Sequence, residues 1–268
     1  MEFERASLEL DGSVAILRMN HPEVLNAMSP EMLKGVNDAL DALAASNERT
    51  RCLVLTGAGR AFCTGANLQG RGNGQVRRGA GHTLETLIHP LLRRLRDLPF
   101  PLLTAVNGPA AGVGMSVALM GDLILCARSA YFLQAFRRIG LVPDGGSTWL
   151  LPRLIGRARA MELSLLGERL PADTALAWGL VNRVFDDAAL MTETVRMARE
   201  LAEGPTVALG LMRRLYWDSP HNSYEQQLDL ECRTQQRAGE TEDYREGVKA
   251  FLEKRPPDYS RFRKKPPW

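Results

Sequence analysis

The hydrophobic pattern of the first residues predicts a hairpin followed by a helix and a buried strand. Two short β-type runs, residues 7–10 and 14–19, flank the turn pair Asp11-Gly12, which is typical of a hairpin. Apolar residues then recur at helical spacing over residues 30–45, with Ser29 as the N-cap and Pro30 at the first helical position. A continuous apolar run over residues 51–56 indicates a buried strand.

The same order of elements recurs further along the chain. A predicted helix over residues 84–96 leads into a strand over 102–106, and a short helix after Gly112 precedes a strand over 122–126 and a helix near 147–154. This alternation predicts an α/β core whose catalytic loops lie at strand ends. Beyond Asp186 only helical periodicity is left, and its apolar faces favour packing on another subunit; the predicted helices cover residues 190–203, 205–217, 224–238 and 242–254.

Composition and charge are those of an ordinary globular protein. The chain has 268 residues, 45% hydrophobic and 24% charged, with a net charge of +3, so nucleic acid is not an expected partner. The N-terminus lacks the layout of a signal peptide, and no apolar run reaches the roughly 18 residues of a membrane span, which predicts a cytoplasmic protein. The four cysteines are scattered, so buried thiols are expected rather than disulfides or a zinc site.

Two glycine-bounded turns, residues 57–68 and 107–115, are the most distinctive features of the sequence. Each follows a predicted buried strand, and small residues there let a ligand approach free main-chain NH groups. The second turn also opens a helix whose positive end favours an anionic oxygen. A dinucleotide fingerprint is excluded because Val117 replaces its third glycine, and the signatures of nucleotide hydrolysis, serine acyl transfer and zinc proteolysis are missing from the sequence.

With these turns the chain resembles the crotonase superfamily, which includes enoyl-CoA hydratases and isomerases. The resemblance rests on residues 51–68, 105–114, 140–146 and 244–254, in the order that the superfamily has them. It implies an α/β fold, a spiral of strand-strand-helix repeats over residues 1–200, followed by a helical trimerisation region over residues 201–268. The implied assembly is a homotrimer, or a hexamer made of two trimers. Within the superfamily the chain is similar to the ring epoxide isomerases of the phenylacetyl-CoA pathway.

The resemblance also implies a site. The backbone NH groups of Ala66 and Val113 would bind the thioester carbonyl oxygen as an oxyanion hole, and Asp144 would be the acid that moves the proton. An acyl-CoA thioester is the implied partner, with coenzyme A as part of the substrate and no metal or further cofactor. The implied substrate contacts surround the two turns or, for the last two residues, come from the C-terminal helix of a neighbouring subunit; they are Ala27, Ala61, Gly65, Asn67, Leu68, Gly112, Phe136, Phe251 and Lys254.

The acidic residues decide which reaction is expected. Hydratases of the superfamily carry glutamates at the positions of Ser116 and Phe136, and neither side chain here moves a proton as a carboxylate does. This favours an isomerase that uses Asp144, with a pKa raised by apolar surroundings. The alternatives are a hydratase of low efficiency that uses Asp144 and a bound water, and an acyl-CoA or RNA binding protein without turnover. Asn67 replaces an acid that is typical of the ring epoxide isomerases. The identity of the acyl group is therefore not determined by this resemblance.

Overall fold

The computed structural model describes residues 1–45, 50–68 and 80–261. Seven strands form the larger sheet in the order β1 Glu2–Phe3, β2 Ala6–Asp11, β3 Val14–Met19, β4 Cys52–Gly57, β5 Leu102–Val106, β7 Leu123–Ala127 and β10 Arg183–Phe185. Three short strands form a second sheet, in the order β6 Ala110–Ala111, β8 Tyr131–Leu133 and β9 Arg169–Pro171. The principal helices are α1 Pro30–Ala45, α2 Ala80–Thr83, α3 His89–Arg96, α4 Val113–Ala118, α5 Ser147–Leu166, α6 Ala172–Trp178, α7 Leu190–Glu203, α8 Thr206–Asp218, α9 Tyr224–Gly239 and α10 Glu242–Leu252.

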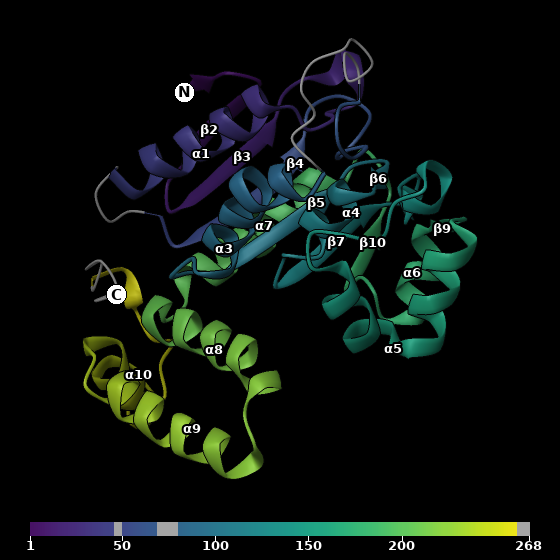
Figure 1. The fold of residues 1–268 in the computed structure, drawn as a ribbon. Helices are drawn as coiled ribbons and strands as arrows, with labels where there is room; N and C mark the ends of the chain where they lie inside the picture. Colours follow the sequence, from purple (N-terminus) through teal and green to yellow (C-terminus); the bar gives the residue numbers. More distant parts are fainter. Residues whose placement is uncertain (46–49, 69–79, 262–268) are drawn as a thin grey trace.

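The larger sheet changes from antiparallel to parallel pairing at β3. Strands β1 to β3 pair antiparallel, and from β3 through β4, β5 and β7 to β10 every pair is parallel. Every residue of β4 and β5 is buried, which is the pattern of parallel strands with both faces covered. Helix α1 packs on β2 and β3, and α7 packs across β3, β4, β5 and β7 (Figure 1). The α/β class predicted from the alternation is confirmed.

Two of the predicted helices differ from expectation. The segment predicted as one helix over residues 84–96 contains a π-helical turn, Leu84–Ile88, before α3. Pro90 lies just after this turn, has no NH to donate, and crowds the preceding residues with its ring, so α-helical hydrogen bonding is interrupted there. Helix α5 extends twelve residues past the predicted end, to Leu166, with a break at Gly156, whose backbone φ is 78°.

The C-terminal helices lie beside the sheet rather than on it. Figure 1 shows α8, α9 and α10 in green to yellow, below and apart from the strands. Helix α9 buries none of its residues, so Cys232 on it is exposed, whereas Cys52, Cys63 and Cys126 are buried. The expectation of a buried thiol was therefore wrong for Cys232, because α9 contacts only α8 and α10 to any extent in the described part of this chain and these bury none of its residues.

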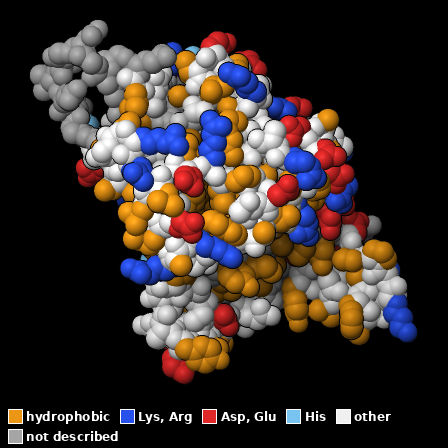
Figure 2. Space-filling view, turned by 90° about the vertical axis from the view of Figure 1, so that its right-hand side faces the viewer, with side chains coloured by type: hydrophobic (Ala, Val, Ile, Leu, Met, Phe, Trp, Pro, Cys, Tyr) orange, Lys and Arg blue, Asp and Glu red, His pale blue; other side chains and the backbone are white. Residues whose placement is uncertain are grey.

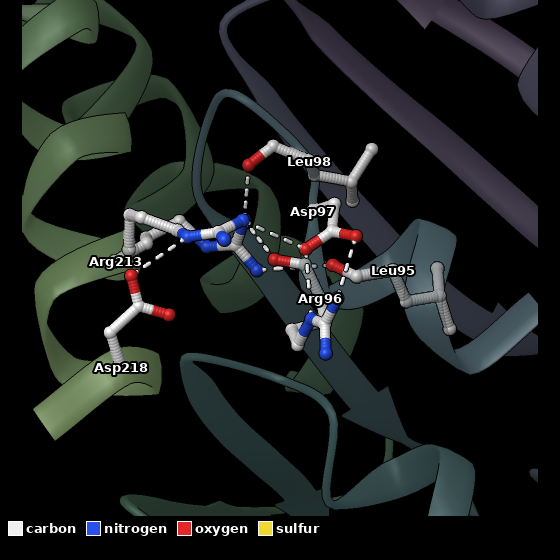
Figure 3. A network of polar contacts seen from close by, with 7 residues as sticks. Leu95, Arg96, Asp97, Leu98, Arg213 and Asp218 are labelled. Atoms are coloured by element: carbon white, nitrogen blue, oxygen red, sulfur yellow. Dashed lines mark hydrogen bonds and ion pairs between the residues drawn. The ribbon is translucent and has the colours of Figure 1, made fainter. Parts of the chain in front are cut away.

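A buried arginine attaches α8 to the core. The guanidinium of Arg213 forms an ion pair with Asp122. It also donates hydrogen bonds to the carbonyl oxygens of Leu95, at 3.2 Å, in the last turn of α3, and of Leu98, just after that helix (Figure 3). Asp122 also accepts a hydrogen bond from the Leu102 amide, at 2.7 Å. One side chain thus joins α8 to α3 and to the starts of β5 and β7.

Among the described residues, no helix is long and apolar enough to cross a membrane.

Candidate active site

In the first turn, the residues on either side of Ala66 form backbone hydrogen bonds, whereas the Ala66 NH does not. The Met28 amide donates to the Gly65 carbonyl at 2.7 Å, and the Asn67 amide donates to the Met28 carbonyl at 2.7 Å. In such a parallel bridge the residue between the two bonded groups, Ala66, directs its own NH away from the partner strand. Within the part of the chain that the structure describes, this NH donates to no protein acceptor.

In the second turn, the Val113 NH is likewise left without an acceptor in the described chain. The Ala111 amide donates to Cys63 and the Gly112 amide donates to Leu133, each at 2.9 Å. Val113 is the first residue of α4, so its NH precedes the helical hydrogen bonds, and it too donates to no acceptor in the described chain. Gly112 has a φ of 53°, a left-handed conformation that turns the chain into α4 and that glycine adopts without strain.

The two turns are packed backbone against backbone. A β-carbon added to Gly65 would lie 3.1 Å from the Ala111 carbonyl oxygen, and one added to Gly114 would lie 2.2 Å from that of Cys63. At Gly108 it would lie 2.2 Å from the Arg60 carbonyl oxygen. Side chains at these positions would force the turns apart, so glycine is needed for the two free amides to be neighbours.

Asp144 reaches the same region from the next loop. Its backbone carbonyl accepts hydrogen bonds from the hydroxyls of Ser116 and Ser147, both at 2.9 Å. A β-carbon on the adjacent Gly145 would lie 3.5 Å from a methyl of Val113, which places the loop directly against the second turn. Burial raises the pKa of the Asp144 carboxyl to about 6, and its Oδ1 has no hydrogen-bond partner among the described residues.

A cavity of about 390 Å³ opens beside Gly145 and Gly146, between α3, α5 and the end of α8. The Trp149 ring stacks on Trp217 at 5.7 Å and on His221 at 5.6 Å between ring centroids, and these rings line the cavity. Its remaining walls include apolar side chains of Leu92, Met120 and Leu150. His89, Arg93, Arg96, Arg214 and Asp218 also line it, so the cavity next to the Asp144 loop combines apolar walls with charged ones.

Comparison with known proteins shows the family to which the chain belongs. The model of the enoyl-CoA hydratase/isomerase family matches residues 9–262. A 1,2-epoxyphenylacetyl-CoA isomerase of Escherichia coli K12 is 45% identical over 97% of this chain and 99% of its own length. The chain belongs to the enoyl-CoA hydratase/isomerase family.

Other members of the family carry different names. A probable enoyl-CoA hydratase of Rhodobacter capsulatus is 39% identical over 97% of this chain and 99% of its own length. A solved structure of an enoyl-CoA hydratase subunit I from Geobacillus kaustophilus HTA426 has a TM-score of 0.88 at 36% identity, covering 97% of this chain and 99% of that one. The crotonase fold predicted from the sequence is therefore confirmed. Because these relatives are named for two different reactions, the reaction type has to be inferred from the residues of the site.

Most of the residues predicted for an enoyl-CoA hydratase/isomerase site are brought together. Ala27 adjoins the Met28 bridge, Ala61 is buried at the base of the first turn, and Leu68 is exposed just after it. Phe136 is buried, and its ring lies 3.8 Å from where a β-carbon on Gly112 would be. Gly65, Ala66, Asn67, Gly112, Val113 and Asp144 surround the point where the two turns and the Asp144 loop meet.

Phe251 and Lys254 are not brought to this point within one chain. Phe251 is 81% exposed on α10, and Lys254 follows that helix, apart from the strand ends (Figure 1). Their predicted role belongs to a neighbouring subunit and stays a prediction.

Sequence reasoning missed two contributions to this site. Ser116 was noted only as a missing acid, yet its hydroxyl fixes the backbone of Asp144. Trp217 and His221 belong to the region predicted to be a helical appendage, and they line the cavity beside Gly145. The signal for Ser116 was its place one turn into the helix after Val113, on the side that faces the turns. Nothing local in the sequence pointed to Trp217.

Proposed function

We propose that this chain is an isomerase that shifts a proton, and with it a double bond, within an acyl-CoA thioester. The observation that carries the proposal is the combination at Asp144 of a pKa near 6 and an Oδ1 without a partner among the described residues, beside the Val113 turn. A base that must take a proton and later return it works best with a pKa near the working pH. The two free amides supply hydrogen-bond donors where the negative charge would collect.

The proposed reaction needs only these groups. The thioester oxygen accepts hydrogen bonds from Ala66 and Val113, and the Asp144 carboxylate takes a proton from the carbon next to the carbonyl. The C–H electron pair then forms a double bond to the carbonyl carbon, and the former C=O pair moves onto oxygen. For a β,γ-unsaturated acyl group, the Asp144 carboxylic acid returns the proton to the γ-carbon, so that the C=O bond reforms and the double bond moves next to it.

Ser116 and Phe136 argue against hydration as the principal reaction. Addition of water requires activation of the water and protonation of carbon. The Ser116 hydroxyl already donates to the Asp144 carbonyl, and Phe136 is a buried aromatic ring. Asp144 would have to perform both steps alone.

The acyl group would occupy the cavity beside Gly145, and coenzyme A would pass along Ala27, Ala61, Gly65, Asn67 and Leu68. Phe251 and Lys254 of a neighbouring copy would contact coenzyme A in a homotrimer or in a pair of trimers. Exposed apolar side chains, which association with another copy would bury, support this assembly. Figure 2 shows hydrophobic side chains gathered in the lower half of the face that carries α5 and α6, and a groove of about 750 Å³ between α5 and α8 is lined by Leu154, Met212 and Tyr216.

The proposal is tested with a β,γ-unsaturated thioester such as 3-hexenoyl-CoA in water labelled with ¹⁸O. We expect the conjugated 2-enoyl product without label, and Asp144→Asn should lower the rate by about 10² to 10⁴ while acyl-CoA affinity is kept. No reaction of 3-hexenoyl-CoA together with labelled 3-hydroxyhexanoyl-CoA formed from 2-hexenoyl-CoA would identify a hydratase instead. Binding without conversion of any thioester in a panel of unsaturated and ring-containing acyl groups would identify a binding protein.

A further inference from the structure

Two asparagine side chains that the proposed reaction does not use lie behind the donor turns. We propose that Asn26 and Asn107 are positioning residues that set the distance and direction between the Ala66 and Val113 amides. This inference rests on the proposed function, because it assigns the two side chains to the hydrogen-bond donors of that reaction.

Asn26 holds the first turn at its start. Its side chain is fully buried, and its Nδ2 donates to the carbonyls of Ala58 at 2.9 Å and Ala61 at 2.7 Å. Its Oδ1 accepts from the His21 amide at 2.8 Å, so both donor hydrogens and the acceptor are used. Two residues later, Met28 makes the bridge that brackets Ala66. The segment 26–28 therefore holds the first turn both at its start and at its donor.

Asn107 joins the second turn to the first. It follows β5, and its Nδ2 donates to the carbonyls of Gly57 and Gly59, both at 2.9 Å. Its Oδ1 accepts from the Gly57 amide at 3.3 Å. The two turns are joined again near the donors, where Cys63 and Ala110 form a bridge. Because Asn107 and this bridge lie on either side of Gly108, the path of the second turn over the first is fixed at two points.

A primary amide is the side chain that this arrangement requires. Each asparagine donates twice to main-chain carbonyls; Asn26 also accepts from the His21 amide, and Asn107 accepts from the Gly57 amide and the Thr56 hydroxyl. A carboxylate of the same shape has no hydrogen to donate. An aspartate in its place would put a negative charge against two carbonyl oxygens. The donor turns would then move apart or fluctuate, and donors that are not held in place stabilise a developing charge less.

The experiment uses Asn26→Asp and Asn107→Asp, with Asn37→Asp as the matched control. Asn37 also donates to a backbone carbonyl, that of Leu33 at 2.8 Å, and accepts from Arg94 at 2.9 Å, but it lies on α1 away from the turns. The probe is butyryl-CoA labelled with ¹³C at the carbonyl, a saturated thioester with no double bond to move. The infrared carbonyl band of the bound probe reports hydrogen bonding to its oxygen, and circular dichroism reports the folded fraction.

We expect the band of the probe bound to the unmodified protein to lie below that of the free thioester. At saturation, both turn variants should return the band toward the free value, and kcat on 3-hexenoyl-CoA should fall about 10- to 100-fold with a smaller change in KM, short of the roughly 10² to 10³ that loss of a whole donor costs. Asn37→Asp should keep both values. Asn107→Ser, which retains one donor, should restore part of the band shift.

The positioning role is overturned if folded variants keep the band and kcat of the unmodified protein, or if losses merely follow the unfolded fraction. Should Asn26→Asp not fold, the half-buried Asn107 variants decide the question. If the unmodified protein itself shows no lowered band, the proposed oxyanion hole is wrong, and that result is distinct from failure of the asparagines.

Discussion

At the scale of single residues, the Asp144 carboxyl should determine how activity depends on pH. Its pKa of about 6 means that the carboxylate, the form that takes a proton, is lost below that pH. We therefore expect kcat/KM on 3-hexenoyl-CoA to fall about tenfold per pH unit below 6 and to be level toward neutral pH. A pH series with a stopped assay measures this. A profile that is flat through pH 6 would contradict Asp144 as the base.

The Asp144 carboxyl should also affect stability, and its charged form should destabilise the folded protein. The folded pKa of about 6 lies above the ordinary value of 3.8, so the fold disfavours the charged carboxylate. The resulting loss of stability is present above about pH 6 and disappears as the pH falls toward 3.8. Asp144→Asn should therefore raise the thermal unfolding midpoint at neutral pH, and the gain should vanish on acidification.

Asp187→Asn is the control for this measurement. Hydrogen bonds from Ser129 lower the pKa of the Asp187 carboxyl, which is the opposite shift. Its replacement should give no gain in the unfolding midpoint at neutral pH. An equal gain for both variants would show that the effect does not come from burial of the Asp144 carboxyl.

At the scale of elements, the buried side chain of Arg213 is a principal polar contact between α8 and the core. Arg213→Met would leave the Asp122 carboxylate without its cation and the Leu95 and Leu98 carbonyls without their donor. Burial already raises the pKa of Asp122 although Arg213 opposes the shift. Breaking a buried pair on one side typically costs about 3 to 5 kcal/mol, and we expect a loss of that order in the free energy of unfolding measured with urea.

Arg214 provides the matched comparison on the next position of α8. Its guanidinium pairs with Asp97 at 3.2 Å and with Asp218 at 3.0 Å, but its side chain is 58% exposed (Figure 3 shows Asp97 and Asp218). Arg214→Met should cost only about 0 to 1 kcal/mol. If the two substitutions had equal effects, burial of Arg213 would not be what holds α8. The double variant Asp122→Asn with Arg213→Met should regain part of the loss, since no unpaired charge is then buried.

At the scale of the whole molecule, the groove between α5 and α8 should be an interface between copies. The variant Leu154→Glu with Met212→Glu places two charges on its apolar lining, and desolvating them would oppose association. We expect sedimentation velocity to show a smaller species than the unmodified protein gives. Leu10→Glu, at an exposed leucine on β2, should leave the size unchanged. An unmodified protein that sediments as a monomer would refute the proposed trimer.

Local chemistry determined much of what the sequence could predict. Helix α1 was placed to the residue because Ser29 accepts from the Met32 amide at 3.3 Å, as an N-cap does, and because Pro30 is compatible with the first turn. The strands before both turns were found because a short, continuous apolar run that ends in turn residues is typical of a buried strand. The carboxyl at position 144 was singled out by resemblance.

Tertiary structure decided everything that depends on contacts between distant residues. Whether the Ala66 and Val113 amides remain free depends on the hydrogen bond from the Met28 amide to Gly65 and on those that the Ala111 and Gly112 amides donate to Cys63 and Leu133, which no local pattern encodes. The raised pKa of Asp144 depends on burial beside another loop, and Trp149 and Trp217 meet because α8, which Arg213 joins to the core, packs against α5. Periodicity and capping act over a few residues, whereas a site is made by close packing between segments, so the sequence alone determined the elements and the fold determined the site.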